Sequence, residues 1–292
     1  MKIMGGPFSE VPVCPEENSP HLSDALGPVW MTGSGSAALL SVLRQIRHRV
    51  KEKKIWLPAY YCDGMNQMIR AQGFEIDYYP TVGCPGRGIR ALPDPGQLSG
   101  VVLLMEYYGF SATWKADQLD QLREKGVLLI EDVTHSLLRG SWHRQADFWF
   151  GSLRKWTGVY TGGFYAGTAS IPPPLDARIN TAFVDSLDSF FDAYTEYLYT
   201  GQGDRGFFRD SFWQAQKALE ADPEAIAIDP RDLHRLKRWN TALVRRKRRK
   251  NARLIFSEIR KKEVFLYPEM EQEDMPFFVP IFIPEKREKR DS

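Results

Sequence analysis

A turn rich in glycine and serine lies between a short apolar stretch and a run of apolar residues at helical spacing. The turn is Gly33-Ser34-Gly35-Ser36-Ala37-Ala38, and the run after it carries Leu39, Leu40, Leu43 and Ile46. A turn of this kind offers backbone N–H groups, hydroxyls and the positive end of a helix, which together suit a phosphate dianion. We therefore predict that Gly35, Ser36 and Ala37 bind a phosphate. The alternative is a strand-to-helix turn without a ligand.

A carboxylate follows the apolar stretch 127–130. At the end of a buried strand, Asp132 is suited to keeping a pyridine nitrogen protonated, which makes the ring an electron sink. The alternative is an N-cap for residues 133–138, a role that aspartate favours. Glu131 and His135 would complete a compact polar group. His135 would then either bond the phenolic oxygen of a pyridine cofactor or pack as an ordinary histidine.

A lysine lies 155 − 132 = 23 residues beyond Asp132, after a second sheet-like segment. A lysine that joins an aldehyde must be held at the reacting ring and kept partly desolvated. Ser152, three residues before Lys155, offers the phosphate another hydroxyl, and the glycines at 162–163 allow close backbone approach. The alternative is a surface lysine. Together the three segments indicate pyridoxal phosphate, held by its phosphate, its ring nitrogen and a Schiff base.

Apolar strands that alternate with helices must position these residues. We expect strands at 28–31, 54–57, 74–79, 101–105, 127–130, 147–150 and 164–167, and helices within 39–50, 63–73 and 116–125. Strands that are hydrophobic on both faces indicate a mostly parallel sheet covered on both sides, a three-layer α/β/α sandwich. Ligands of such sheets bind at the carboxyl ends of the strands, where the Ser34 turn, Tyr60-Tyr61, residues 106–108 and Asp132 should meet.

The remaining segments have simpler patterns. Residues 80–99 are rich in glycine and proline and are expected to form a surface loop. Helices are expected at 178–199 and 208–221, a long basic helix at 231–262 and a last strand at 277–283. We divide the chain into an N-terminal arm (1–28), a major cofactor-binding domain (29–230), and a helix with a partial C-terminal small domain (231–292).

The composition favours an ordinary globular protein. The 292 residues carry 39 basic and 37 acidic side chains, a net charge of +2 that favours no particular partner. No apolar run reaches the ~20 residues that span a bilayer, and no signal-peptide core precedes residue 30. Three scattered cysteines are too few for a disulfide framework or a zinc site. We expect a cytoplasmic protein without a metal or a membrane partner.

Four motifs, in order and spacing, resemble one family. They are Ser34-Gly35-Ser36-Ala37-Ala38-Leu39, Leu57-Pro58-Ala59-Tyr60-Tyr61, Glu131-Asp132-Val133-Thr134-His135, and Gly151-Ser152-Leu153-Arg154-Lys155-Trp156 with Gly162-Gly163. They look like the pyridoxal-phosphate-dependent sugar aminotransferases of the DegT/DnrJ/StrS type, which have the aspartate-aminotransferase (type I) fold. The resemblance covers residues 28–170 well and the helices to about 280 loosely.

The resemblance implies a role for each matched residue. Lys155 would be the Schiff-base lysine, Asp132 the partner of the ring nitrogen, and His135 a neighbour of the phenolic oxygen. Ser36 and Ala37 would hold the phosphate with help from Ser152, and Tyr61 would lie over the ring. Family members transfer an amino group, here from glutamate, to a keto sugar on a nucleotide carrier, as homodimers with active sites at the subunit boundary. They also continue further in sequence, so an alternative is a cofactor-binding homologue with impaired turnover.

Two other interpretations come from single motifs. The turn at 33–38 also satisfies the dinucleotide pattern Gly-x-Gly-x-x-Ala, which would make the chain an NAD(P)-dependent oxidoreductase. That interpretation expects an acidic residue after the second strand, where Pro58 stands instead. The basic hexamer 245–250 suggests nucleic-acid binding. Apolar residues around it favour a solvated helix face, so we expect no nucleic-acid partner.

Overall fold

The computed structural model describes residues 29–110, 113–139, 142–143, 145–168 and 178–283. Seven strands form a mixed sheet in the order β1-β9-β8-β7-β6-β2-β3, and two further strands, β4 and β5, pair by themselves. Three of the printed strand pairs of the main sheet are parallel and two are antiparallel. The expected α/β fold with a mostly parallel sheet is therefore confirmed. The expected arm (1–28) and the end of the chain (284–292) lie outside the described residues.

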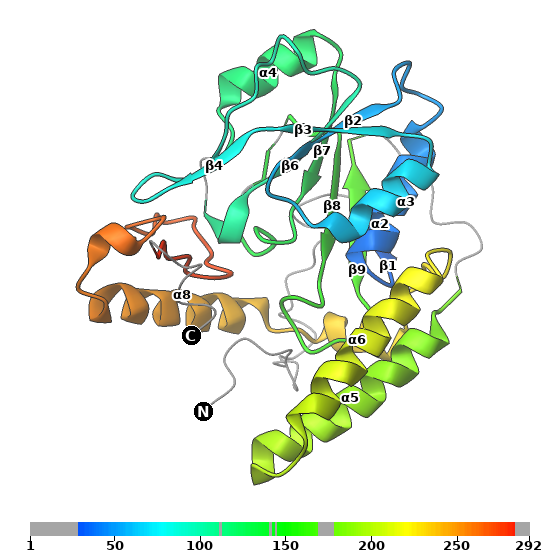
Figure 1. Cartoon of the computed structure of the whole chain (residues 1–292), viewed down its shortest axis with the longest axis vertical. Coiled ribbons are helices and arrows are strands. Elements are labelled where there is room, and N and C mark those ends of the chain that lie inside the picture. Colours follow the sequence, from blue (N-terminus) through cyan, green and yellow to red (C-terminus); the bar gives the residue numbers. More distant parts are fainter. Residues whose placement is uncertain (1–28, 111–112, 140–141, 144, 169–177, 284–292) are drawn as a thin grey trace. The chain divides into compact units, whose positions relative to one another are not determined.

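The chain divides into two compact units, and the first contains residues 1–49, 67–72 and 148–241. Its sheet strands are β1 (Val29–Thr32), β8 (Phe148–Ser152) and β9 (Gly163–Gly167), and β9 pairs antiparallel with both of the others. Helix α2 (Gly35–Ile46) packs on all three strands (Figure 1). Its leucines 39, 40 and 43 are at most 1% exposed, and full burial of such a side chain contributes about 1.5–3 kcal/mol.

Three more helices belong to the first unit. Helices α5 (Thr181–Thr200) and α6 (Arg205–Ala221) form an antiparallel hairpin, seen side by side in Figure 1. An aromatic cluster that includes Phe190, Phe191 and Tyr194 holds the hairpin together. The short helix α7 (Pro230–Lys237) begins at Asp229, whose carboxylate accepts the N–H of Arg231.

The second unit contains residues 50–66, 73–147 and 242–292. Its parallel strands are β2 (Lys54–Pro58), β3 (Glu75–Tyr79), β6 (Val101–Met105) and β7 (Leu128–Asp132). Its helical segments are α4 (Ala116–Glu124), α8 (Thr241–Glu258) and the 3-10 turns Asp63–Met65, Tyr107–Gly109 and Lys262–Val264; α3 (Asn66–Ala71) follows the first of these turns. No helix within the described residues is long and apolar enough to cross a bilayer.

The expected surface loop at 80–99 instead contains an antiparallel hairpin. Strands β4 (Thr81–Cys84) and β5 (Gly88–Ala91) pair directly across a short turn. Gly86 and Gly88 both have φ = +73°, a conformation that glycine adopts without steric cost. The glycines that indicated a loop therefore serve a tight turn between two strands.

Two C-terminal expectations were wrong. The long basic helix is two helices, because the chain breaks between α7 and α8 at residues 238–240, where Trp239 is buried. The expected strand at 277–283 is reduced to one bridge between Phe265 and Ile281. Pro280 has no N–H to give to a ladder, and the N–H groups of Met275 and Phe277 bond the carbonyls of residues 109 and 108 instead.

Candidate functional site

The predicted phosphate turn opens helix α2 in the first unit. Ser34 is the N-cap, and its Oγ accepts the N–H of Ala37 at 3.0 Å. The Ala37 amide is therefore already bonded within the protein. The amides of Gly35 and Ser36 belong to the first helical turn, whose N–H groups have no partner inside the helix. The donors that this turn can offer a phosphate are therefore the amides of Gly35 and Ser36 and the half-buried hydroxyl of Ser36.

Ser152 lies beside this turn. A Cβ placed on Gly35 would stand 3.1 Å from the Cβ of Ser152, a tight approach that a glycine at 35 avoids. Gly163 pairs with Thr32 on one side and Ser152 on the other, and a Cβ on it would meet the Ser34 carbonyl oxygen at 2.1 Å. The structure therefore brings together the glycine turn, Ser152 and Gly163, as the motifs predicted.

Lys155 follows β8 in a tight turn of the same unit. The Leu153 amide bonds the Gly162 carbonyl at 3.0 Å, and the amides of Trp156 and Thr157 both bond the Leu153 carbonyl. Most side chains of this turn are buried, whereas Lys155 is exposed. Lys155 thus lies three residues after the serine that touches the glycine turn. The partial desolvation expected of a Schiff-base lysine is not seen, and the exposed side chain matches the alternative of a surface lysine.

Asp132 ends β7 in the second unit and is 5% exposed. Its Oδ1 accepts the N–H of Thr134 at 2.9 Å, which closes a turn at the end of β7; residues 133–138 form turns rather than the helix that the capping alternative assumed. Its Oδ2 accepts the hydroxyl of Tyr61 at 2.9 Å. Met105 pairs with Asp132 at the ends of β6 and β7, and Tyr61 follows β2, so the expected meeting of strand ends is confirmed within this unit.

Tyr61, which was expected to lie over the cofactor ring, donates its hydroxyl to Asp132. Burial and the Asp132 charge raise the pKa of its phenol well above the usual range, so the phenol keeps its proton and donates it. The adjacent Tyr60 hydroxyl lies 2.8 Å from that of Tyr108, and Tyr107 donates to the Tyr60 carbonyl. Tyr60, Tyr107 and Tyr108, which follow β2 and β6, thus bond one another, and Tyr61 bonds the carboxylate.

His135 is enclosed by aromatic rings of the same unit. Its imidazole stacks on Tyr108 with a centroid distance of 5.4 Å and on Phe277 at 4.9 Å. Tyr108 has φ = +59°, a left-handed conformation that is costly for a tyrosine, and its carbonyl accepts the Phe277 N–H at 2.7 Å. The sequence did not indicate that residues 275–278 take part in this region, because their contact with the turn at 107–109 is long-range.

Glu131 is not part of the Asp132 group, which corrects the expected compact polar group. Adjacent strand residues point to opposite faces of a sheet. Glu131 accepts the His143 N–H at 2.9 Å, and the His143 ring bonds the Glu106 carboxylate at 2.8 Å. Burial raises the pKa of the Glu131 carboxyl to about 7. Burial opposes charge on His143, but the Glu106 hydrogen bond and the nearby carboxylates raise its pKa overall.

Because of the buried cluster of Glu131, His143 and Glu106, we expect the free energy of unfolding to fall as the pH rises from 5 to 8. Between pH 4.5 and about 7 the unfolded chain releases a proton that folded Glu131 keeps, and the difference corresponds to about 3 kcal/mol. The raised pKa of His143 acts in the same direction above 6.5. Glu131→Gln should flatten this slope in urea unfolding at four pH values. The exposed Glu124→Gln is the control, and an unchanged slope in Glu131→Gln would contradict the assignment.

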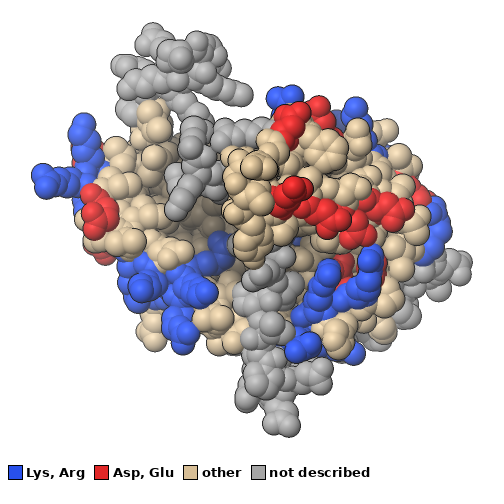
Figure 2. All heavy atoms as spheres, turned by 90° about the horizontal axis from the view of Figure 1, so that it is seen from below, with Lys and Arg blue, Asp and Glu red and all other residues tan. Residues whose placement is uncertain are grey.

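The basic hexamer in α8 is largely used inside the fold. Arg245 donates to the Leu138 carbonyl, Arg248 to the Phe277 carbonyl at 2.9 Å, and Arg249 to carbonyls of residues 271–274. Arg246, Lys247 and Lys250 are exposed. Figure 2 shows Lys and Arg side chains in several separate groups on the face drawn, with Asp and Glu side chains between them. Half of the run is therefore bonded within the fold, two arginines to the C-terminal segment and Arg245 to Leu138, which weakens the nucleic-acid interpretation.

The expected site residues fall in two sets. Gly35, Ser36, Ala37, Ser152 and Lys155 belong to the first unit, and Tyr61, Asp132 and His135 to the second. Within the described residues, no group of three or more histidine, cysteine, aspartate or glutamate side chains could hold a metal ion. The dinucleotide interpretation is disfavoured, because β1, which leads into the glycine turn, is an edge strand of the sheet and pairs antiparallel with β9.

No family model matches the sequence, and a search of curated proteins finds no match. Among solved structures, the chain is similar to a DegT/DnrJ/EryC1/StrS aminotransferase from Brucella abortus, with 14% identity, a TM-score of 0.48, and coverage of 86% of this chain and 64% of that one. The apo methionine gamma lyase CalE6 from Micromonospora echinospora has 14% identity, a TM-score of 0.49, and coverage of 84% and 57%. The third, 3-amino-5-hydroxybenzoic acid synthase, has 16% identity, a TM-score of 0.39, and coverage of 53% and 40%. The chain thus spans between 40% and 64% of the length of these proteins.

Proposed function

We propose that the protein is a pyridoxal-phosphate-dependent aminotransferase that moves an amino group from glutamate to a keto sugar carried on a nucleotide. The observation that supports this most directly is in the first unit, where an exposed lysine leaves β8 beside a helix-opening glycine turn. A phosphate held at the turn and an aldehyde near the lysine are two features of one small cofactor. The function is proposed from these residues and the motifs, since the structural likenesses are distant.

The donors at the glycine turn fit a phosphate dianion. Two first-turn amides, those of Gly35 and Ser36, add to the hydroxyls of Ser36 and Ser152 and to the positive end of a twelve-residue helix. Ala37 does not offer its amide to the phosphate, because that N–H is bonded to Ser34. The task of this turn is to bind the anion and so fix the distance between the cofactor and Lys155.

When bound, the cofactor supplies an aldehyde that joins amines and a ring that accepts electrons from the substrate carbon. Lys155 would attach the aldehyde through its Nζ and, once displaced by the substrate amine, would carry the proton between the substrate carbon and the cofactor. Asp132 would keep the ring nitrogen protonated, with Tyr61 and Thr134 orienting its two oxygens. His135, held by its aromatic neighbours, would face the phenolic oxygen.

A visible spectrum tests the proposal. Protein loaded with pyridoxal phosphate should show a yellow absorbance band, and borohydride should abolish it and fix the cofactor on the peptide that contains Lys155. Added glutamate should replace the yellow band with that of the pyridoxamine form. Loading without any response to glutamate would instead support the cofactor-binding homologue with impaired turnover. A protein that never takes up the cofactor would refute the proposed function, and a keto-sugar nucleotide that fails to restore the yellow band would refute the acceptor.

A further inference from the structure

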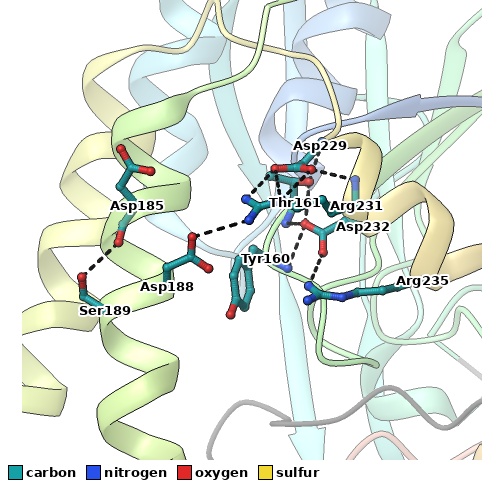
Figure 3. Close-up of polar contacts among 9 residues, drawn as sticks. All are labelled: Tyr160, Thr161, Asp185, Asp188, Ser189, Asp229, Arg231, Asp232 and Arg235. Atoms are coloured by element: carbon teal, nitrogen blue, oxygen red, sulfur yellow. Dashed lines mark hydrogen bonds and ion pairs between the residues drawn. The ribbon is translucent and has the colours of Figure 1, made fainter.

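A buried carboxylate of α7 holds the segment that links Lys155 to strand β9. Asp232 is 1% exposed, and its Oδ2 accepts three donors: the Tyr160 N–H at 3.1 Å, the Thr161 N–H at 2.7 Å and the Thr161 hydroxyl at 2.9 Å. Arg235 donates to the other oxygen at 3.0 Å (Figure 3). A carboxylate that accepts several donors while it is buried fixes the backbone that carries them.

Thr161 ties this backbone to α7 a second time. Its hydroxyl oxygen accepts the N–H of Asp229, the N-cap of α7, at 2.8 Å. Thr161 therefore donates to one aspartate and accepts from the backbone of another, as Figure 3 shows. Both contacts are buried, so the position of residue 161 follows that of α7.

The next residue, Gly162, is bonded to both the lysine turn and the glycine turn of the first unit. The Gly162 carbonyl accepts the Leu153 N–H at 3.0 Å, which closes the turn that carries Lys155. The Gly162 N–H donates to the Gly33 carbonyl at 2.8 Å, which holds the start of the glycine turn. One peptide segment thus joins the lysine turn and the phosphate turn, and Asp232 is the side chain that anchors it.

The chain just before α7 holds the glycine turn from its other side. The Gly33 N–H donates to the Ile226 carbonyl at 2.8 Å, and a Cβ on Gly33 would stand 2.7 Å from the Ala227 carbonyl oxygen. Gly33 is therefore bonded through both its N–H and its carbonyl to segments that α7 organises. The geometry of the turn depends on these long-range contacts as well as on its local sequence.

We propose that Asp232 is a positioning residue for the cofactor: through Thr161 and Gly162 it keeps the lysine turn and the phosphate turn at a fixed separation. This inference rests on the proposed function, because it assumes that one ligand engages both turns. Removing the carboxylate would leave the two buried donors of Thr161 and the part-buried Tyr160 N–H without their acceptor. The segment would relax, and a misplacement of about 1 Å at a reacting group can cost 10²-fold.

Three variants and one control test the role. Asp232→Ala removes the acceptor, Asp232→Asn keeps one oxygen for the Tyr160 and Thr161 donors, and Thr161→Val removes only the hydroxyl. The control, Asp185→Asn, neutralises an exposed carboxylate on α5, which Figure 3 shows away from the contacts of Asp232 with Tyr160 and Thr161. The readouts are the dissociation constant of pyridoxal phosphate, the fraction fixed by borohydride at saturation, and amide exchange of residues 160–162 without cofactor.

In Asp232→Ala we expect the dissociation constant to rise at least about 30-fold, the fixed fraction to fall, and residues 160–162 to exchange faster. Asp232→Asn should recover most of the affinity, and Asp185→Asn should stay within about twofold of wild type. If Asp232→Ala does not fold, Asp232→Asn and Thr161→Val carry the test, with a smaller loss expected in each. Wild-type affinity and fixation in the folded variants would overturn the positioning role. Failure of the wild-type protein to bind the cofactor would instead overturn the proposed function.

Discussion

Lys155→Ala should abolish all borohydride fixation of pyridoxal phosphate, shift the visible band to that of the free aldehyde, and lower turnover by roughly 10²–10⁴-fold or more. The reason is that Lys155 is the exposed amine that leaves β8 beside the glycine turn, where a phosphate-anchored aldehyde would be presented. The turn itself is untouched, so the cofactor should still bind, without a covalent bond. Visible spectra, mass spectrometry after borohydride and aminotransferase assays provide the measurements.

Lys155→Arg separates covalent attachment from charge. Arginine keeps a positive charge beside the phosphate turn but does not form the bond to the aldehyde, so it should retain affinity and lose fixation. Lys217→Ala, which removes an exposed lysine of α6 in the same unit, should behave as wild type. Borohydride fixation that survives in Lys155→Ala and disappears in Lys217→Ala would mean that another amine holds the cofactor.

The features that local sequence determines were predicted well. The positions of the glycine turn and of the strands β1, β8 and β9 follow from residues close in sequence, and the glycine pair at 162–163 indicated a close backbone approach, which the structure shows at Ser34. The parallel strands β6 and β7 are apolar throughout, which is typical of a covered sheet. Their carboxyl ends predicted where Asp132 and the tyrosines would gather.

The features that depend on long-range contacts were missed. The antiparallel pairing of β1 and β9 joins segments more than a hundred residues apart, and no local pattern specifies it. The hydrogen bond from Thr161 to Asp232 joins residues that are 71 apart in sequence, and an aspartate in a short basic helix has no distinctive sequence pattern. Phe277 beside His135 is a contact of the same kind.

One error was avoidable from the sequence. Glu131 and Asp132 are neighbours in a strand, so their side chains had to diverge to opposite faces. That rule alone would have separated a carboxylate with a raised pKa, paired with His143, from one bonded to Tyr61. Strand alternation is therefore a better guide to which of two adjacent acids serves a site than their closeness along the chain.

Asp132→Asn should leave the protein folded and the cofactor covalently bound, and lower turnover by about 10²–10³-fold, the usual loss when one preorganised electrostatic group is removed. Asparagine retains the oxygen that accepts the Thr134 N–H, and the Tyr61 hydroxyl can rotate to accept from the new amide. Only the negative charge is lost. The glutamate half-reaction, followed as decay of the yellow band in a single turnover, measures the effect on the chemical step.

Tyr61→Phe is the matched comparison, because it removes the hydrogen bond at Oδ2 and leaves the carboxylate in place. If the charge is what matters, Tyr61→Phe should slow the half-reaction less than about tenfold, the size expected for one hydrogen bond to a charged group. Equal losses in Asp132→Asn and Tyr61→Phe would show that orientation rather than charge limits the reaction. A wild-type rate in Asp132→Asn would remove Asp132 from the ring nitrogen altogether, since a neutral amide does not hold a proton on a pyridine.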